Sequence, residues 1–329
     1  MSSTAAEIRR RHAGSSRLAL GCMRLTDFYH PAVARDEATE VLRAALDAGI
    51  EPLDTAGIYE GNESLLGAFL ESLDRDRLPL VSTKVGQRRD PTDPSRRILA
   101  CRPDELRRDL EESNRQLGTA PAIAFLHRTD PAIPVADSVG ALCDAAADGL
   151  AGSVGVCDLT PADLAAAAES PSVQFAQYEV SLFEERSESR AEACDRAGVQ
   201  LLAYCPLARG LLAPGSSVWR GLEGDDYRSG LTRLTGSEAE WNKETVIRIR
   251  DEVAAPNGIS LPQLALAWVR SLGPGCTPLV GARSVAQLAD LVKAPETLSG
   301  DDLAAIARIL RERPPAGLGR RAQSRILDA

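Results

Sequence analysis

Short apolar runs alternate with segments of helical periodicity along most of the chain. After the first apolar run, Arg17–Gly21, apolar residues recur at i, i+3, i+4, i+7 and i+8 from Ala38 to Leu46. This spacing predicts one buried face of a helix. Asp36 is a candidate cap before this helix, and Gly49 is a stop signal after it.

The alternation continues to the end of the chain and predicts eight strand-helix units. Strands are expected at residues 17–21, 51–54, 80–84, 123–126, 152–156, 173–177, 200–204 and 277–280. Helices are expected near 38–46, 62–73, 101–117, 134–149, 160–169, 186–197, 243–255 and 261–271. Strands joined by helical crossovers are parallel, so eight units predict an α/β fold with a closed (β/α)8 TIM barrel. An open doubly wound sheet is the alternative, although no Gly-x-Gly-x-x-Gly follows the first strand.

One barrel domain is expected to occupy residues 1–329, with an N-terminal extension at 1–16 and a loop-like tail at 314–329. Two long irregular segments, Gln87–Leu99 and Leu207–Glu240, follow predicted strands and would form loops on the C-terminal face of the barrel. Such loops often shape a substrate pocket, and a mobile excursion is the alternative for Leu207–Glu240. The arginines of Gln87–Leu99 alternate with aspartates, which favours a solvated loop over a binding patch.

Composition excludes several classes of function. The formal net charge of -9 disfavours nucleic acid as a partner, and no apolar run is long enough to suggest a membrane span. Seven cysteines without a Cys-x-x-Cys pair indicate reduced thiols in a cytoplasmic protein. The three histidines have no metal-ligand spacing, so no metal site is expected.

Four polar residues lie where the predicted strands reach their carboxyl ends. Asp54, Lys84 and His127 end the second, third and fourth strands, and Tyr59 lies in the loop after the second. In a barrel these residues converge on one face. A phenol near an ammonium group is a better acid, a carboxylate can hold that ammonium, and a histidine can orient a carbonyl. The set therefore indicates proton transfer to a carbonyl oxygen.

These residues belong to motifs that resemble the aldo-keto reductase family over about Leu18–Val292. In chain order the motifs are Gly21-Cys22-Met23, Asp54-Thr55-Ala56 with Tyr59 and Asn62-Glu63, Ser82-Thr83-Lys84, Leu126-His127-Arg128, Gly155-Val156, Ala203-Tyr204 with Pro206-Leu207, and Gly281-x-Arg283-Ser284. The resemblance implies reduction of an aldehyde or ketone to the alcohol, with hydride from NADPH. Tyr59 would be the general acid, Lys84 would lower its pKa, Asp54 would pair with Lys84, and His127 would position the carbonyl.

The same resemblance implies a binding site for NADP(H) across the barrel mouth. Gln177 would contact the nicotinamide carboxamide, Tyr204 would stack on the ring, and Cys205–Leu211 would lie against the pyrophosphate. Arg283 would meet the 2′-phosphate. The full set of implied cofactor residues is Gly21, Met23, Asp54, Asp158, Gln177, Tyr204, Cys205, Leu207, Arg209, Gly210, Gly281, Arg283, Ser284 and Gln287.

The chain also departs from the family pattern. Cys157-Asp158 stands where the family usually has Ser-Asn, and Cys205 replaces a serine. Because Asp158 lacks an amide donor, a cofactor-binding regulatory or accessory subunit with little turnover is an alternative. A barrel aldolase with a Schiff base on Lys84 is another, but it leaves the cofactor motifs unexplained. Substrate and oligomeric state are not predicted, although specificity would come from Phe28–Pro31 and the two long loops.

Overall fold

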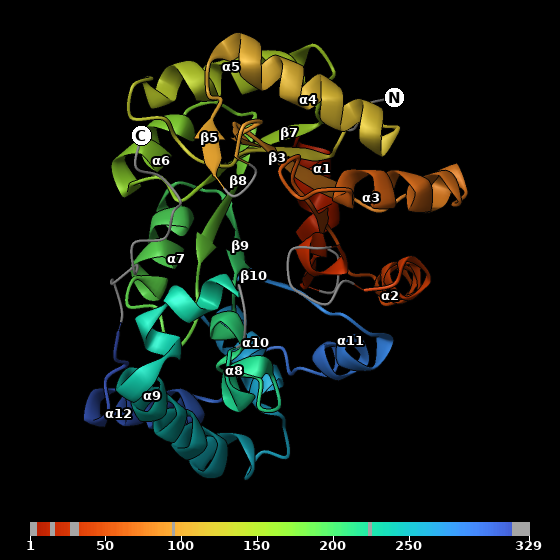
Figure 1. The fold of residues 1–329 in the computed structure, drawn as a ribbon. Helices are drawn as coiled ribbons and strands as arrows, with labels where there is room; N and C mark the ends of the chain where they lie inside the picture. Colours follow the sequence, from red (N-terminus) through yellow and green to blue (C-terminus); the bar gives the residue numbers. More distant parts are fainter. Residues whose placement is uncertain (1–4, 14–16, 27–32, 94–95, 223–225, 318–329) are drawn as a thin grey trace.

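A closed barrel of eight parallel strands forms the centre of the molecule, with helices arranged around it (Figure 1). The computed structural model describes residues 5–13, 17–26, 33–93, 96–222 and 226–317. Each strand pairs with its neighbour along the chain, and the last closes on the first. The barrel strands are β1 Ala19–Gly21, β2 Leu53–Asp54, β3 Val81–Val85, β6 Ile123–Leu126, β7 Ser153–Cys157, β8 Val173–Glu179, β9 Gln200–Tyr204 and β10 Cys276–Val280.

The predicted strands are confirmed to within a few residues at each end, and closure excludes the open doubly wound sheet. The strands of a parallel barrel are covered on both faces, so they read as nearly continuous apolar runs. Every residue of β3 is buried, including polar Ser82, Thr83 and Lys84. Polar residues on such a buried strand depart from its apolar pattern and therefore indicate a functional site.

Helices cover the barrel where periodicity predicts them. Their bounds are α2 Arg35–Asp47, α3 Asn62–Glu71, α4 Pro103–Leu117, α5 Val135–Ala147, α6 Pro161–Ala167, α7 Ser187–Arg196, α9 Gly236–Ile249 and α10 Leu261–Ser271. A π-helical turn, η6 Arg250–Ala254, extends α9. Gly49 follows α2 in the left-handed region, as a stop signal should, but the proposed cap at Asp36 is wrong. Ala34 occupies the N-cap position, and Asp36 lies in the first turn.

Both long irregular segments contain secondary structure that the sequence pattern does not reveal. Gln87–Leu99 includes an antiparallel pair, β4 Gln87–Arg89 and β5 Arg97–Leu99. Its polar residues occupy both faces, so the apolar alternation of a strand is missing. Leu207–Glu240 includes η3 Ala208–Gly210, α8 Ser217–Arg220, η4 Tyr227–Gly230, η5 Thr232–Leu234 and the start of α9. Phe28–Pro31 lies outside the described residues.

Three further helices lie outside the predicted set. Helices α11 Val285–Val292 and α12 Gly300–Glu312 follow the last strand, and α1 Ala5–Ala13 lies within the expected N-terminal extension. Ile8 of α1 is 2 % exposed and packs with the apolar side chains inside the barrel. His12 contacts the carbonyl oxygen of Glu51 and the hydroxyl of Thr277, each at 3.1 Å. Because Glu51 and Thr277 lie at the amino ends of strands, α1 covers that end of the barrel, and the opposite end is left for a site.

No helix in the described part of the chain is long and apolar enough to cross a bilayer.

Two helical glycines offer a matched test of this packing. A methyl group at Gly67 of α3 would clash with the backbone carbonyl oxygen of Gln116 in α4, whereas one at Gly140 of α5 meets no atom. We expect Gly67→Ala to lower the free energy of unfolding by about 1–3 kcal/mol through overpacking. Gly140→Ala should raise it by about 0.5–1 kcal/mol because alanine is the better helix former. Urea denaturation measures both, and equal effects would contradict the close approach of α3 and α4.

Candidate active site

A buried ion pair lies at the carboxyl ends of β2 and β3. The Nζ atom of Lys84 donates to Oδ2 of Asp54 at 2.5 Å and to the carbonyl oxygen of Thr55 at 2.7 Å. Both charged side chains are 4 % exposed. Oδ1 of Asp54 accepts from Ser82 Oγ and Gln177 Nε2, each at 2.7 Å. Buried charges are tolerated when they are paired and hydrogen-bonded in this way.

Tyr59 and His127 lie beside this pair. Lys84 Nζ is 5.2 Å from the centroid of the Tyr59 ring. The Tyr59 and His127 rings meet edge to face, with centroids 6.1 Å apart and planes at 87°. Nδ1 of His127 is buried and has no hydrogen-bond partner among the described residues. The fold thus brings together the four residues that the sequence proposes for proton transfer.

The charges of the site act on Tyr59 in opposite directions. Burial raises the pKa of Tyr59 above its usual value, while Lys84 lowers it, Asp54 raises it and Arg128 lowers it. Lys84 therefore acts in the expected direction, but the net pKa of the phenol is raised. The phenol keeps its proton at neutral pH, as a general acid must.

The two other titratable groups have well-defined charge states. Burial opposes the charge of Lys84, but Asp54 and Tyr59 outweigh it and raise the pKa of the ammonium above its ordinary value. An amine held as a paired cation is a poor nucleophile, which disfavours the Schiff-base alternative. Burial, Arg128 and Lys84 lower the pKa of His127 well below its usual value, so the imidazole is neutral at pH 7.

Asp158 follows β7 in the left-handed region, at φ 54°. Its Oδ2 accepts from the hydroxyl of Tyr204 at 2.8 Å and pairs with Nη1 of Arg128 at 3.0 Å. Its Oδ1 is buried and has no hydrogen-bond partner among the described residues. A buried carboxylate oxygen of this kind suits an incoming amide N–H group. The role of Arg128 was missed, although it directly follows His127 in the motif.

The loop after β9 has an unusual backbone. Cys205, Ala208 and Arg209 have φ values of 56°, 48° and 58°, and Gly210 has 106°. Left-handed residues other than glycine cost about 1–3 kcal/mol each and gather at functional sites. Burial raises the pKa of Cys205 to about 11, so its thiol stays protonated. We call residues 205–211 the cofactor loop, because the family resemblance implies that this stretch, including Leu207, lies against the pyrophosphate.

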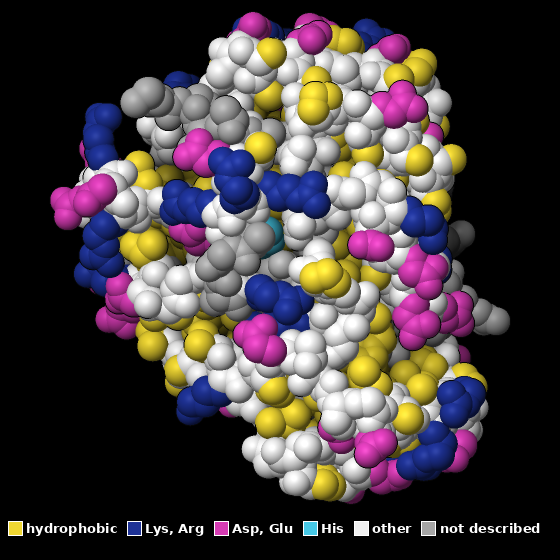
Figure 2. Space-filling model, turned by 180° about the vertical axis from the view of Figure 1, so that it is seen from behind, with side chains coloured by type: hydrophobic (Ala, Val, Ile, Leu, Met, Phe, Trp, Pro, Cys, Tyr) yellow, Lys and Arg dark blue, Asp and Glu magenta, His cyan; other side chains and the backbone are white. Residues whose placement is uncertain are grey.

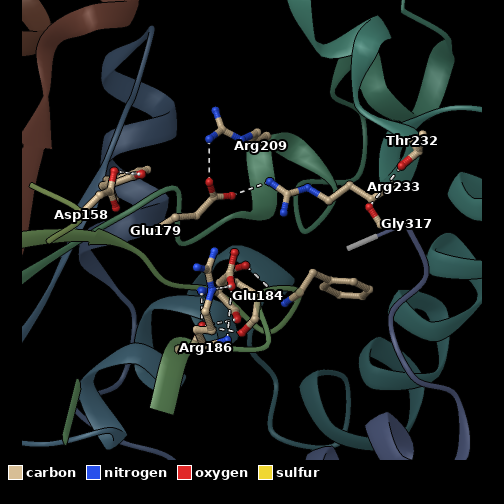
Figure 3. Close-up of polar contacts among 12 residues, drawn as sticks. Asp158, Glu179, Glu184, Arg186, Arg209, Thr232, Arg233 and Gly317 are labelled. Carbon is tan, nitrogen blue, oxygen red and sulfur yellow. Dashed lines mark hydrogen bonds and ion pairs between the residues drawn. The ribbon is translucent and has the colours of Figure 1, made fainter. Parts of the chain in front are cut away.

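Glu179, at the end of β8, holds the cofactor loop through Arg209 (Figure 3). Arg209 Nη2 donates to Glu179 Oε2 at 2.6 Å, and Arg233 of η5 donates to Oε1. Burial opposes the charge of Glu179, but the two arginines lower its pKa to about 2. Sequence reasoning missed Glu179. A signal was present, because it lies two residues after Gln177 and so on the same face of the strand.

The residues expected at the adenosine end surround the start of α11. The side chain of Ser284 accepts from the backbone N–H of Gln287 at 3.3 Å and so caps this helix. Oε1 of Gln287 accepts from the backbone N–H of Arg283 at 2.9 Å. A methyl group at Gly281 would lie 3.1 Å from Arg24 Cδ, so a larger residue there would require the Arg24 side chain to shift slightly.

Gly21 ends β1 next to this region, and Met23 lies in the short helix η1 Cys22–Leu25 that follows. Every residue of the proposed cofactor set thus lies near or beyond the carboxyl end of a barrel strand, at one mouth of the barrel. Among the described residues no group of three or more His, Cys, Asp or Glu side chains could hold a metal ion.

Lys and Arg side chains rim a hollow in the surface, with a histidine at its floor (Figure 2). Arg97 of β5 adds positive charge near His127, because it helps to lower the pKa of that imidazole. Burial lowers the pKa of Arg97 itself. Arg97 is partly buried, whereas its neighbour Arg96 is exposed, so the arginines of this loop are not equally solvated.

The sequence model of the Aldo/keto reductase family matches residues 17–311. The chain belongs to this family. Its members are NAD(P)H-dependent oxidoreductases, so this aldo-keto reductase is an enzyme of that class.

Solved structures share the fold of this chain. The glycerol dehydrogenase AKR11B4 from Gluconobacter oxydans superposes with a TM-score of 0.81 at 26% identity, over 92% of this chain and 93% of that one. The holo form of the aldo-keto reductase AKR11C1 from Bacillus halodurans gives 0.73 at 20% identity, over 93% and 95%. The thermostable aldo-keto reductase Tm1743, in complex with epalrestat, gives 0.66 at 25% identity, over 89% and 94%.

The buried pair can be tested by its energetics. Removing one partner of a buried ion pair leaves an uncompensated charge and costs roughly 3–5 kcal/mol. We expect this loss in the free energy of unfolding for Asp54→Asn, which leaves the ammonium of Lys84 unpaired. The double variant Asp54→Asn/Lys84→Met should recover more than half of the loss, as measured by urea denaturation.

The control is an exposed pair. Asp148 forms an ion pair with Arg107 at 2.6 Å on the surface, so Asp148→Asn should leave the free energy of unfolding nearly unchanged. A loss for Asp54→Asn no larger than that for Asp148→Asn would show that the Lys84 ammonium is solvated rather than dependent on its partner.

Proposed function

We propose that this aldo-keto reductase uses NADPH to reduce an aldehyde or ketone to the alcohol, with Tyr59 as the general acid. The observation that carries the proposal is the buried Asp54–Lys84 pair beside the Tyr59 ring, with His127 edge-on to that ring. This arrangement supplies a proton donor, a cation that stabilises the donor after it loses its proton, and a neutral imidazole.

Each residue has one part in the proton transfer. The Tyr59 phenol, whose pKa is raised by burial, holds its proton until negative charge develops on the carbonyl oxygen. Lys84 then stabilises the phenolate, because a nearby cation favours the charged form. Asp54 fixes the ammonium in place. Neutral His127 can donate one ring N–H to the same oxygen and so orient the carbonyl.

The bound nicotinamide ring supplies the hydride, since no side chain can. The buried Oδ1 of Asp158 fits its carboxamide, because a carboxylate accepts from an amide N–H₂ group. Tyr204 would flank the ring, the cofactor loop would meet the diphosphate, and Arg283 would meet the 2′-phosphate of NADP(H). This fit favours an active enzyme over an accessory subunit, because Asp158 retains a hydrogen-bond role in place of asparagine.

The substrate is a small carbonyl compound, and the glycerol dehydrogenase AKR11B4, 26% identical, makes glycerol and its oxidation products a first panel to test. The seven cysteines are all free, which supports a reducing, cytoplasmic location.

Tyr59→Phe tests the proton donor. General acid catalysis contributes about 10²–10⁴-fold, so kcat/KM for aldehydes should fall by a factor in that range. The Kd for NADPH should change less than about twofold, since this variant removes only the hydroxyl group and leaves the ring. Consumption of reduced nicotinamide, followed by its absorbance, measures the rate.

Two outcomes would oppose the proposal. Wild-type protein that binds NADPH tightly but reduces no carbonyl in a broad panel would favour the accessory subunit. A Tyr59→Phe variant as active as the parent would remove Tyr59 as the acid.

Arg283→Gln tests the cofactor preference. A guanidinium hydrogen-bonded to a phosphate contributes about 1.5–3 kcal/mol, so kcat/KM with NADPH should fall by about tenfold or more. The rate with NADH should hardly change, because NADH lacks the 2′-phosphate. Arg311→Gln, at an exposed position on α12, is the control and should alter neither rate. A parallel loss with both cofactors would assign Arg283 another role.

A further inference from the structure

Glu179 joins two segments that are distant in sequence. Its carboxylate, 13 % exposed, accepts from Arg209 in the cofactor loop and from Arg233 in η5 (Figure 3). Two cations share one anion, so the group carries a net positive charge. We call Glu179, Arg209 and Arg233 the clamp.

The clamp acts where the cofactor loop needs support. Arg209 is itself one of the left-handed residues, so its backbone conformation is maintained only by its surroundings. Both terminal nitrogens of its guanidinium donate, Nη2 to Glu179 at 2.6 Å and Nη1 to the hydroxyl of Tyr227 at 2.9 Å. Its carbonyl oxygen accepts from Arg228 Nη1 at 3.2 Å. Helix η4 therefore contacts both the side chain and the backbone of Arg209, and Glu179 of β8 holds the side chain from another segment.

Arg233, the second arginine of the clamp, lies beside the C-terminal segment, residues 314–317. Asn242 Nδ2 donates to the carbonyl oxygens of Arg233 and Ala316, each at 3.0 Å. Thr232 donates to the carbonyl oxygen of Gly317 at 3.1 Å, as Figure 3 shows. A methyl group at Gly317 would lie 2.6 Å from the backbone nitrogen of Arg233. The C-terminal segment thus packs directly on the residue that contacts Glu179.

We propose that the clamp positions the cofactor loop and sets its affinity for the cofactor diphosphate, with the C-terminal segment as its outer support. Glu179 is a positioning residue in this proposal, because it acts through Arg209 and does not touch the reacting atoms. The proposal rests on the proposed function, since it assigns the loop to NADPH. Rigidifying a binding loop in advance increases affinity by lowering the ordering cost on binding.

Three variants test the clamp, each by fluorescence titration with NADPH and by kcat at saturating NADPH. Glu179→Gln keeps the shape and removes the charge, so the Kd for NADPH should rise about tenfold or more. Arg233→Met removes the second arginine that contacts Glu179 and should also raise the Kd for NADPH. Gly317→Ala, outside the cofactor set, should raise it about threefold, a size typical of changes transmitted through a packed network. For all three, kcat should change less than about twofold, because the catalytic residues are untouched.

Glu184 provides a matched control. It follows β8 closely, its side chain is 14 % exposed, and it pairs with Arg190 and Arg186 instead of the cofactor loop (Figure 3). Glu184→Gln should therefore leave the Kd for NADPH unchanged. Circular dichroism melting shows whether each variant is folded. If Glu179→Gln does not fold, Arg233→Met and Gly317→Ala still decide the question.

The outcomes separate this proposal from the proposed function. Folded Glu179→Gln and Arg233→Met variants that bind NADPH as tightly as wild type would overturn the clamp. So would a fall in kcat at unchanged Kd, which would place Glu179 in the chemical step. Wild-type protein that fails to bind NADPH would instead overturn the proposed function before any variant is compared.

Discussion

The ion pair between Asp54 and Lys84 is the constraint on which the site depends. Two charges inside the barrel are tolerable only because each has several fixed partners, and those partners come from different strands. Gln177 reaches Asp54 from β8, across the barrel from β2. Asp54 and Lys84 come from neighbouring strands, but the contact from Gln177 requires the closed barrel, which places β8 opposite β2.

The two ends of the barrel have different roles, packing at the amino end and ligand binding at the carboxyl end. At the amino end, His12 is buried against Glu51 and Thr277, and burial lowers its pKa to about 4, so it is a neutral packing residue. At the carboxyl end, polar groups retain unused hydrogen-bonding capacity in Asp158 and His127. Buried polar atoms are normally satisfied, so such exceptions mark the end that receives ligands.

Sequence alone predicted the parts of the molecule that have a strong periodic or motif signal. Strands β6 and β9 were predicted to the residue, and the four proton-transfer residues do meet. The β4–β5 pair was missed because Arg88 and Arg89 lack apolar alternation. Helix α1 was missed because its nine residues are mostly charged or small and show no apolar periodicity. Its one large apolar residue, Ile8, is buried only because the barrel closes around it. The clamp was missed because it joins residues 179, 209 and 233 through space.

Asp158 stands where the family usually has asparagine, and neighbouring residues compensate for this change. A left-handed position after β7 accepts asparagine or aspartate more readily than most residues, so the backbone there need not change. The added charge is balanced by Arg128, and one carboxylate oxygen is used by the Tyr204 hydroxyl. The remaining oxygen can still accept from an amide. The substitution therefore removes an amide donor but keeps a hydrogen-bond acceptor at this position, and Arg128 balances the added charge.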